Sequence, residues 1–428
     1  MARVYTEPER TLEVSGAYDV VVAGGGIAGV AAAIAASRNG ASVCLLEKEY
    51  ALGGLATLGL VIAYLPICDG RGRKVCGGLA EELLLLSAAE GAGEVPDCWL
   101  PGGNPAERVK HRYYLEYNAA SYILALERIL VDLGVTILYD TRCCAVMGTD
   151  RVEALVVENK NGRTAIECRT AVDATGDADL CAFAGEPTVS LATNSASGWY
   201  YSLVDGRPSL HKLHQPFDPE GAVVMPGADR GYAGDDALEV TAHMLASRDL
   251  IRNHQRELRE EKPESPVLPF LIPTFPGFRM TRRLAAGVEV DADDRKEYPD
   301  SIGLISDWRR RGPVYSIPLR AIRAPRHPNL FVAGRCISAT GHGWDMTRVI
   351  PPCAVTGEAA GTACAMIARG AAGAGGAGAA AADEAGAQSA AAATGTTGTG
   401  DLEIAALQDR LRQQGNHLFL SELEPARS

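Results

Sequence analysis

The chain has 428 residues, and its 53 Asp and Glu exceed its 41 Lys and Arg to give a formal net charge of −12. This length is typical of two or three domains that share a large buried core. The excess of acidic residues argues against a non-specific nucleic-acid binder and against docking on anionic membranes, because both need clustered Lys and Arg.

The sequence also bears on compartment and metal binding. No uncharged apolar run of about 18 residues occurs, so we expect no transmembrane helix. The first residues, MARVYTEPERTLEV, are charged and lack the apolar core of a secretory signal. The 11 cysteines form no C-x-x-C pair, which disfavours a metal site and a disulfide-reductase centre. We therefore expect a cytoplasmic protein with no metal and with no nucleic-acid or membrane partner.

The N-terminal region contains one βαβ unit. Residues 19–23 (DVVVA) are a continuous apolar run, typical of a parallel strand that is covered on both faces. The Ala-rich stretch 27–38 predicts a helix, and residues 42–46 (SVCLL) predict the next parallel strand. This alternation indicates an α/β fold.

A glycine motif, Gly24-x-Gly26-x-x-Gly29, occupies the turn between the first strand and the helix. The first glycine permits a tight turn, the second lets the backbone approach a pyrophosphate, and the third lets helix and strand pack closely. Glu47 follows the second strand, where a carboxylate binds ribose hydroxyls and repels a 2′-phosphate. The unit therefore predicts a dinucleotide site and disfavours NADP.

The rest of the chain divides by composition. Residues 186–320 contain more Pro, Tyr, Trp and charge than the flanking regions, which indicates an inserted domain. Helix and strand patterns outside it predict a helix at about 119–133, strands over about 135–172 with a turn at Asn161-Gly162, a strand at 170–174, and a strand at 329–333 followed by a helix to about Arg369. We predict a first domain part at 1–185, an inserted substrate domain at 186–320, a second domain part at 321–369, a flexible Ala/Gly/Thr linker at 370–400, and a C-terminal helix and tail at 401–428.

A second glycine pair, Gly53-Gly54, follows Glu47 closely. Such a pair lets backbone pass close to a long extended ligand. The stretch EKEYALGGLATLGLV at 47–61 resembles the N-terminal signature of the FAD-dependent oxidoreductases with the glutathione-reductase-type FAD fold, in the branch related to the succinate dehydrogenase and fumarate reductase flavoproteins. This resemblance implies FAD rather than NAD as the dinucleotide.

Later segments carry the same resemblance. Residues 174–177 (ATGD) resemble the second strand end that contacts FAD in this family, and residues 331–368 resemble its C-terminal flavin motif. Residues 278–303 and 312–322 are similar to segments that lie between these motifs. The resemblance implies a Rossmann-like FAD-binding domain of the glutathione-reductase type with an inserted α+β substrate domain.

The C-terminal flavin motif departs from the family pattern at two positions. Arg335 stands where many members have an acidic residue, and Gly341 separates His342 from the Ser-Ala-Thr stretch. A helix is predicted to begin near Pro351-Pro352, since proline is tolerated in a first turn. Its N-terminus would stabilise an anionic reduced flavin.

The resemblance also implies which residues contact the cofactor. No His lies close to Gly53-Gly54, where relatives with histidyl-linked flavin have one, so we predict non-covalent FAD. The predicted contacts are mainly glycines and other small residues of the four motifs, with a few side chains beside them. They are Gly24, Gly26, Ile27, Ala28, Gly29, Glu47, Lys48, Gly53, Gly54, Ala56, Thr57, Cys143, Ala174, Thr175, Gly176, Gly334, Arg335, Val355 and Thr356.

Candidates for catalysis come from the inserted domain and the C-terminal flavin motif. A His titrates near neutral pH, a Tyr hydroxyl can donate a proton, and an Arg pair can clamp a carboxylate or polarise a carbonyl. The alternatives are a salt bridge from the Arg pair to Asp300 or to one of Asp291–Asp294, and a core position for the Tyr. We predict His342, Arg283 and Tyr315 as catalytic residues and Arg282, Arg320 and Trp344 as substrate contacts.

These features together predict a flavin-dependent oxidoreductase. The flavin would carry a hydride between a small organic substrate and an external electron acceptor or donor, with dehydrogenation as the favoured direction. Two alternatives are a flavin monooxygenase and an FAD-binding electron-transfer subunit of a larger complex. The sequence leaves the substrate, the redox partner and a homo-oligomeric state open.

Overall fold

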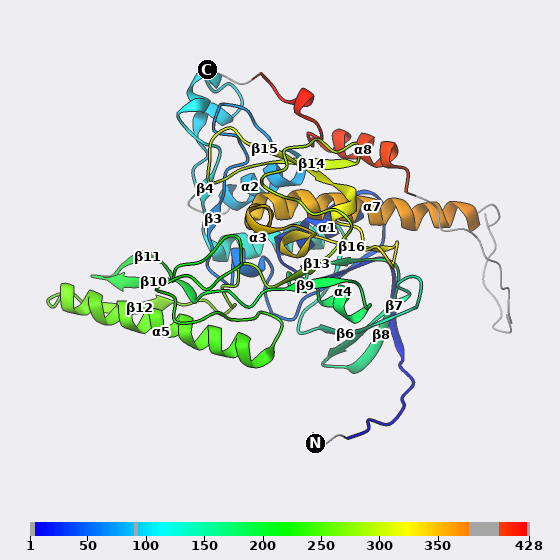
Figure 1. The fold of residues 1–428 in the computed structure, drawn as a ribbon, viewed down its shortest axis with the longest axis horizontal. Coiled ribbons are helices and arrows are strands. Elements are labelled where there is room, and N and C mark those ends of the chain that lie inside the picture. Colours follow the sequence, from blue (N-terminus) through cyan, green and yellow to red (C-terminus); the bar gives the residue numbers. More distant parts are fainter. Residues whose placement is uncertain (1–4, 90–92, 376–401, 426–428) are drawn as a thin grey trace.

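The computed structural model describes residues 5–89, 93–375 and 402–425 (Figure 1). A seven-stranded sheet forms its centre, in the order β5-β2-β1-β8-β7-β6, and β16 also pairs with β8. The seven strands are β1 (Val14–Ala23), β2 (Val43–Leu46), β5 (Thr136–Leu138), β6 (Arg142–Met147), β7 (Ala154–Asn159), β8 (Gly162–Asp173) and β16 (Leu330–Val332).

Five strands of this sheet run parallel, in the spatial order β5, β2, β1, β8 and β16. Their carboxyl ends therefore lie along one edge of the sheet. The strands β6 and β7 extend β8 as an antiparallel pair on its N-terminal half. Val20, Val21 and Val22 are fully buried, as expected for a parallel strand that is covered on both faces.

Helices α1 and α7 pack against each other at unusually short range (Figure 1). A Cβ at Gly357 would lie 2.2 Å from the carbonyl oxygen of Ala28, and one at Gly361 would lie 2.1 Å from that of Ala32. The glycines of α7 therefore let the two helix backbones touch. The helices are α1 (Ile27–Arg38), α2 (Gly78–Ala89), α3 (Ala119–Asp132), α4 (Asp179–Phe183), α5 (Ala237–Glu261), α6 (Gly341–Thr347), α7 (Ile350–Gly375) and α8 (Ile404–Gln413).

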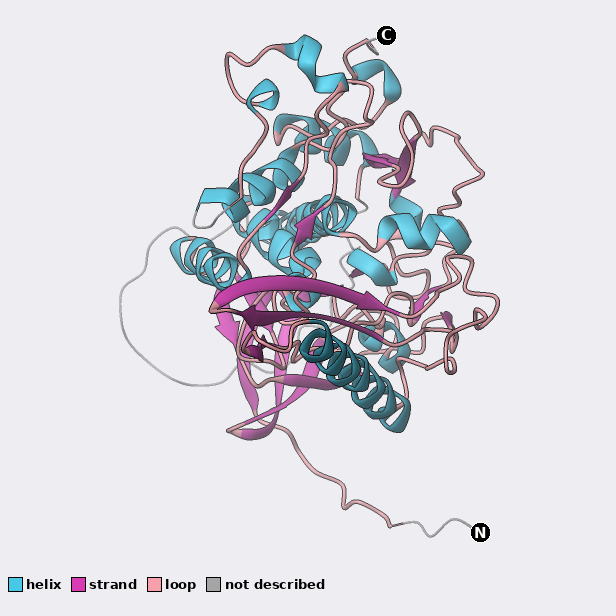
Figure 2. Cartoon of the chain, turned by 90° about the vertical axis from the view of Figure 1, so that its left-hand side faces the viewer, coloured by secondary structure: helices cyan, strands magenta, loops and turns pink. Residues whose placement is uncertain are grey.

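An arm projects from one side of the molecule (Figure 1). It consists of a three-stranded antiparallel sheet in the order β11-β10-β12, with α5 packed on it. Figure 2 looks at the molecule from the side of this arm and shows α5 as one long helix beside the strands. These strands are β10 (Ser197–Val204), β11 (Arg207–His214) and β12 (Val267–Leu271).

Short strand pairs complete the fold. In the β14–β15 pair, Gly303 packs on Val355 of α7, where an added Cβ would lie 2.4 Å from Cγ1 of the valine. This contact ties the end of the predicted insert to the central domain. The pairs are β3 (Ala63–Tyr64) with β4 (Leu115–Glu116), β9 (Thr188–Ser190) with β13 (Arg282–Leu284), and β14 (Ser301–Ser306) with β15 (Val314–Pro318).

This architecture confirms the predicted α/β class with a parallel sheet at its centre. The strand predicted at 19–23 is the carboxyl half of β1, and the helix predicted at 27–38 coincides with α1. The predicted linker at 370–400 lies largely outside the described residues, and α7 continues to Gly375. Within the described ranges, no helix has the length and apolarity needed to cross a membrane. The proposed domain boundaries stay predictions.

Candidate active site

One cavity of about 450 Å³ lies at the carboxyl ends of the parallel strands. Its wall includes Glu47 after β2, Gly24 after β1, Thr175 after β8 and Gly334 after β16. Because β1 lies between β2 and β8 in the sheet, Glu47 and Gly334 lie on opposite sides of the glycine turn that follows β1. Ligands of open α/β sheets bind at this edge, and the volume is within the range of ligand sites, about 300–1,000 Å³.

The glycine turn fits a dinucleotide because each glycine meets a different constraint. Gly24 has a φ of +104°, and an added Cβ there would lie 2.4 Å from the carbonyl oxygen of Ala174. A Cβ at Gly26 meets no protein atom within 4 Å, so this position opens to the cavity. A Cβ at Gly29 would lie 1.8 Å from the carbonyl oxygen of Gly24. The N-terminus of α1 is thereby held at the cavity wall, where its free N–H groups favour a pyrophosphate.

Glu47 closes one end of the cavity. Its carboxylate accepts hydrogen bonds from the backbone N–H of Gly25 at 2.6 Å and of Glu49 at 2.9 Å. Burial raises the pKa of this carboxyl group, and the two backbone donors act in the opposite direction. Lys48 also lies on the wall, with its ammonium 5.2 Å from the centre of the Phe275 ring. This end is suited to hold a ribose through its hydroxyls.

The Gly53–Gly54 loop lies beside the glycine turn. The N–H of Gly53 donates to the carbonyl oxygen of Gly25 at 2.8 Å, and both loop glycines have positive φ, +99° and +55°. Thr57 does not line the cavity. Its hydroxyl donates to the carbonyl oxygen of Leu52 at 2.5 Å and so fixes the loop from behind.

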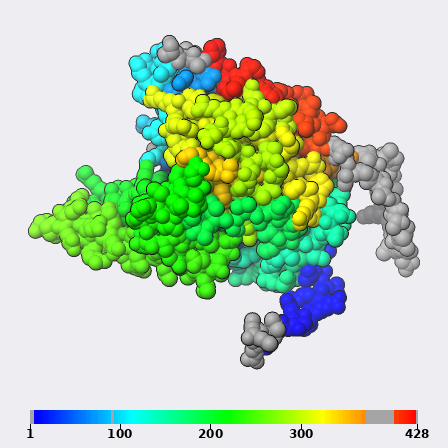
Figure 3. Space-filling model, in the orientation of Figure 1, coloured from blue at the N-terminus to red at the C-terminus, as the bar shows by residue number. Residues whose placement is uncertain are grey.

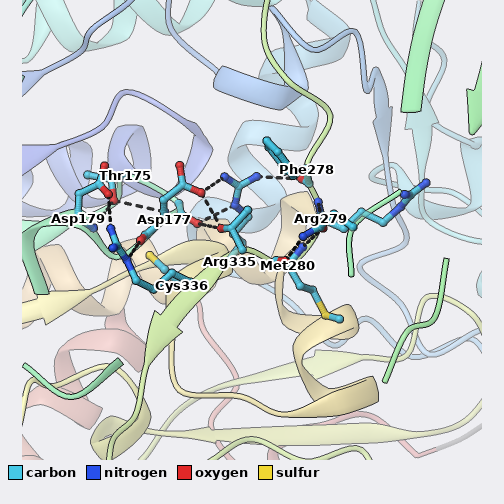
Figure 4. Close-up of polar contacts among 12 residues, drawn as sticks. Thr175, Asp177, Asp179, Phe278, Arg279, Met280, Arg335 and Cys336 are labelled. Carbon is cyan, nitrogen blue, oxygen red and sulfur yellow. Dashed lines mark hydrogen bonds and ion pairs between the residues drawn. The ribbon is translucent and has the colours of Figure 1, made fainter. Parts of the chain in front are cut away.

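Arg335 lies on the cavity wall and forms an ion pair with Asp177, which is largely buried and does not itself line the cavity (Figure 4). The guanidinium donates to the Asp177 carboxylate at 2.6 Å, to the carbonyl oxygen of Gly176 at 2.7 Å and to that of Phe278 at 2.9 Å. Arg335 therefore holds three chain segments together. Arg335 stands where many relatives have a carboxylate, after the glycine of the C-terminal motif. In this chain the carboxylate of Asp177, from the 174–177 segment, lies against the arginine.

A second ion pair lies next to this one on the cavity wall. Arg282 of β13 donates to the carbonyl oxygen of Asp177 at 2.7 Å and to the carboxylate of Asp179 at 2.6 Å. Burial, together with the neighbouring carboxylates of Asp177 and Asp173, raises the pKa of Asp179 to about 6. Arg282 thus has a structural role in the turn after β8 and also faces the cavity.

The N-terminal turn of α7 forms the other end of the cavity. Arg348, Ile350 and Cys353 lie on the wall there. Burial raises the pKa of Cys353 to about 12, so its thiol is neutral at physiological pH. Thr356 lies one turn further on and accepts the N–H of Gly334 at 3.0 Å, which joins α7 to the segment after β16. The positive end of this helix dipole therefore lies at the cavity.

Most of the predicted cofactor contacts line this cavity, and four do not. Gly29 and Thr57 lie behind the wall, Val355 packs under β14, and Thr356 bonds to Gly334. The predicted contacts on the wall are Gly24, Gly26, Ile27, Ala28, Glu47, Lys48, Gly53, Gly54, Ala56, Cys143, Ala174, Thr175, Gly176, Gly334 and Arg335.

The predicted catalytic and substrate residues are dispersed. Apart from Arg282, none of them is on the cavity wall. Arg283 points away from its neighbour and pairs with Glu289 at 2.6 Å, because successive residues of a strand face opposite sides. Tyr315 is buried in β15, and Arg320 pairs with Asp300 at the surface.

His342 and Trp344 lie on α6, between the segment after β16 and α7. The indole N–H of Trp344 donates to the carbonyl oxygen of Arg335 at 2.5 Å, so this ring is a buried support for the wall. His342 is partly exposed. Its Nδ1 accepts from Arg309 at 2.6 Å, and its Nε2 lies 3.0 Å from the Glu220 carboxylate. This geometry assigns the ring proton to Nε2.

Several wall residues carry no signal in the sequence analysis. Arg348, Ile350 and Cys353 lie within the 331–368 motif, but the motif does not say which of its side chains face the cofactor. Phe275 belongs to a Pro-rich stretch outside any motif, and it reaches the wall because the N–H of Thr274 donates to the carbonyl oxygen of Leu58 at 3.0 Å. Asp179 and Asp235 are further wall residues that were not predicted.

A protein-family model described as FAD dependent oxidoreductase matches residues 19–198 and 209–374. This match includes the segments that line the cavity. A search of curated proteins gave no match.

Solved structures resemble this chain at low identity. They include p-nitrophenol 4-monooxygenase from Pseudomonas putida (11% identity, TM-score 0.47, 83% of this chain and 82% of that chain), a geranylgeranyl bacteriochlorophyll reductase-like protein from Thermoplasma acidophilum (14%, 0.42, 84% and 80%) and 3-ketosteroid-delta4-(5alpha)-dehydrogenase from Rhodococcus jostii (16%, 0.37, 82% and 98%). In other matches the alignment spans only 59% to 63% of the known chain.

Proposed function

Since the chain belongs to the FAD dependent oxidoreductase family and uses FAD as its cofactor, we propose that it oxidises a small organic substrate by hydride transfer to N5 of non-covalently bound FAD. The electrons then pass to an external acceptor. The observation that carries this proposal is the continuous cavity that extends from Glu47 past the glycine turn to the start of α7. When bound, FAD supplies the hydride-accepting ring.

Different residues along the cavity would bind different parts of the cofactor. Glu47 binds the ribose, the N–H groups at the start of α1 bind the pyrophosphate, and the Gly53–Gly54 loop gives the extended ligand room. At the opposite end, the positive end of the α7 dipole and the Arg348 guanidinium favour negative charge that develops during reduction. Substrate would enter at this end.

His342 is the proposed proton acceptor for the dehydrogenation. Its support is positional, because α6 connects Arg335 to Arg348 and both of these residues lie on the cavity wall. To accept a substrate proton the ring would use the Nδ1 lone pair, so Arg309 would have to turn away from it, and the resulting imidazolium would pass its Nε2 proton to Glu220 or solvent. A partly exposed imidazole with such partners can pass a substrate proton out of the site.

The first test is the visible absorption spectrum of the purified protein before and after acid precipitation. Flavin bands that move to the supernatant support non-covalent FAD, and bands that stay with the pellet overturn that part of the proposal. A colourless protein that cannot be reconstituted with FAD would contradict the whole assignment.

Direction and reaction type follow from anaerobic mixing of the FAD-loaded enzyme with small hydroxy-, amino- and carbonyl-containing compounds. Bleaching of the flavin bands by a reduced compound supports dehydrogenation. Bleaching by NADH or NADPH, followed by oxygen-dependent hydroxylation, would instead favour the monooxygenase alternative. Recovery of the protein only as part of a larger complex would favour the electron-transfer subunit.

A further inference from the structure

Three surface segments near the start of α7 concentrate positive charge. They are 69–74 (DGRGRK), 107–112 (ERVKHR) and 307–312 (DWRRRG), and each holds three Lys or Arg and one acidic residue. The chain as a whole carries a net charge of −12. We call these three segments together the basic surface. Its charge is therefore opposite to that of the molecule.

Direct contacts hold the three segments side by side. The N–H of Gly312 donates to the carbonyl oxygen of Asp69 at 2.8 Å. Arg112 donates to the carbonyl oxygens of Trp308 at 2.8 Å and Asp307 at 3.2 Å. In Figure 3 the residues around 310 (yellow) border those around 100 (cyan) on the same face. The positive charges therefore belong to one continuous surface.

Two exposed arginines of this surface lack a counter-ion. Arg71 and Arg311 are exposed, and neither forms an ion pair with an acidic residue in the described part of the chain. A Cβ at Gly312 would lie 2.8 Å from Nε of Arg71, and one at Gly70 would lie 2.8 Å from Cγ of Arg311. Each arginine therefore packs on a glycine of the other segment. The two positive charges therefore come from neighbouring segments, and an anion bound there would offset their repulsion.

The basic surface reaches the cavity through a short chain of ion pairs. Arg309 donates to His342 and lies 3.6 Å from the carboxylate of Asp345. The other oxygen of that carboxylate lies 2.5 Å from Arg348, which is on the cavity wall. The basic surface is therefore only a few side chains away from the end of the cavity where substrate oxidation is proposed.

We propose that the basic surface docks an acidic electron-carrier protein. This inference rests on the proposed function, because it identifies the external acceptor by its chemistry. Two molecules of a one-electron carrier would each take one electron from the reduced cofactor, and the two protons released would pass to solvent. Oppositely charged surfaces guide such partners into contact and accelerate association.

The width of the basic surface favours a protein over a small anion. Its charges are spread over three segments, and the exposed Arg71, Arg310 and Arg311 line neither the cavity at the sheet edge nor the smaller cavity beside Trp99. Lys74 and Arg108 do line that smaller cavity, but three glutamates lie there with them. A small anion would be held by a few converging donors in a pocket. A protein partner instead uses a broad charged rim for orientation and encounter.

Native cytochrome c and succinylated cytochrome c provide a matched pair of probes, because succinylation converts its lysines to carboxylates and leaves the haem in place. The FAD-loaded, full-length enzyme is titrated with each oxidised form by calorimetry, at about 0.01 M and about 1 M salt, where charge interactions are long-ranged and screened respectively. The variant R71E/R311E reverses the charges of the two exposed arginines that lack a counter-ion. K160E/R256E makes the same charge change at exposed sites on the β7–β8 turn and on α5.

We expect the succinylated form to bind more tightly than the native form at low salt, although the net charge of the enzyme would favour the native form. R71E/R311E should weaken this binding at least about tenfold, K160E/R256E should leave it within about threefold, and high salt should abolish the difference. Equal or tighter binding of native cytochrome c, or no effect of R71E/R311E, would overturn the proposal.

A second measurement follows haem reduction by enzyme that has been photoreduced without substrate. The proposal requires the photoreduced enzyme to reduce succinylated cytochrome c faster than the native form, and R71E/R311E to slow this reaction. Binding without haem reduction would overturn the carrier role. Because the flavin is reduced by light, a failure here is separate from a failure of substrate oxidation. Flavin absorption and thermal melting of both double variants show whether they are folded.

Discussion

Gly26 and Gly29 lie one helical turn apart, and an added methyl group meets different surroundings at each. At Gly26 it would find no protein atom within 4 Å and would enter the cavity. At Gly29 it would lie 1.8 Å from the carbonyl oxygen of Gly24. The substitution Gly26→Ala therefore probes the space for the cofactor, whereas Gly29→Ala probes the packing of the turn itself.

The structure gives the expected magnitudes. Gly26 has φ −66° and ψ 176°, which alanine adopts without strain, and alanine lowers the entropy of the unfolded chain by about 0.4–1 kcal/mol. Because Gly26 is also the N-cap of α1, where alanine is less favourable than glycine by a similar amount, G26A should leave the unfolding free energy of the apoprotein nearly unchanged. At Gly29, alanine gains about 1 kcal/mol of helix preference. However, the carbonyl of Gly24 must retreat by more than about 1 Å, and such overpacking costs about 3 kcal/mol. The net loss for G29A is about 2 kcal/mol.

Two measurements separate these effects. Urea denaturation of the apoprotein gives the free energy of unfolding, and quenching of flavin fluorescence on titration gives the FAD dissociation constant. G26A should unfold like the wild type and bind FAD at least about tenfold more weakly, a loss of about 1.4 kcal/mol. G29A should be weakened in both assays. Wild-type FAD affinity in G26A, or wild-type stability in G29A, would refute the reasoning.

Three further predictions concern single side chains. Arg335→Met leaves the largely buried Asp177 carboxylate without its cation, so urea denaturation should show a loss of about 3–5 kcal/mol; a loss below about 1 kcal/mol would contradict the role of this pair. Glu358 accepts the N–H of Leu79 at 2.8 Å, and burial raises its pKa from 4.5 to about 7. Its contribution to stability is therefore present below pH 4.5 and is lost as the pH rises through 7, by about 3 kcal/mol in total. E358Q should flatten the stability profile over this range, and an unchanged profile would argue against the shift. His342→Gln should slow anaerobic flavin bleaching by substrate about 10²–10⁴-fold and alter its pH profile while FAD still binds; unchanged kinetics would exclude His342 as the proton acceptor.

The parts of the fold that the sequence predicts are those with regular apolar patterns. The strand at 19–23, α1 and the long α7 have continuous apolar or Ala-rich runs, and the structure contains all three. Helix α1 has the predicted bounds, whereas β1 begins earlier, at Val14, and α7 extends beyond Arg369 to Gly375. The sequence did not predict helix α5, because several residues on its buried face are polar. His243, Ser247 and Gln255 face the sheet there, so an apolar period of 3.6 is not visible.

In the candidate site, too, some features could be predicted from the sequence and others could not. Glycines in positive-φ turns have a local backbone reason that the sequence displays, and Gly24, Gly53 and Gly54 all lie on the wall. Side-chain direction depends on tertiary packing, which a motif does not encode. Arg282 and Arg283 are adjacent in the sequence, yet one faces the cavity and the other pairs with Glu289. Arg335 was predicted as a cofactor contact, but its ion pair with Asp177 joins segments that only the fold brings together.

The sheet order also has a consequence for biosynthesis. The cavity wall contains both Gly24, near the start of the chain, and Cys353, near the start of α7. Further along α7, Arg369 donates to the carbonyl oxygen of Asn39 at the end of α1, 330 residues away in the sequence. A nascent chain therefore cannot complete the pocket until almost all of it has left the ribosome. Chains that terminate before α7 would leave α1 uncovered and prone to aggregation or proteolysis. Added cofactor can therefore stabilise only chains whose synthesis has passed the end of α7.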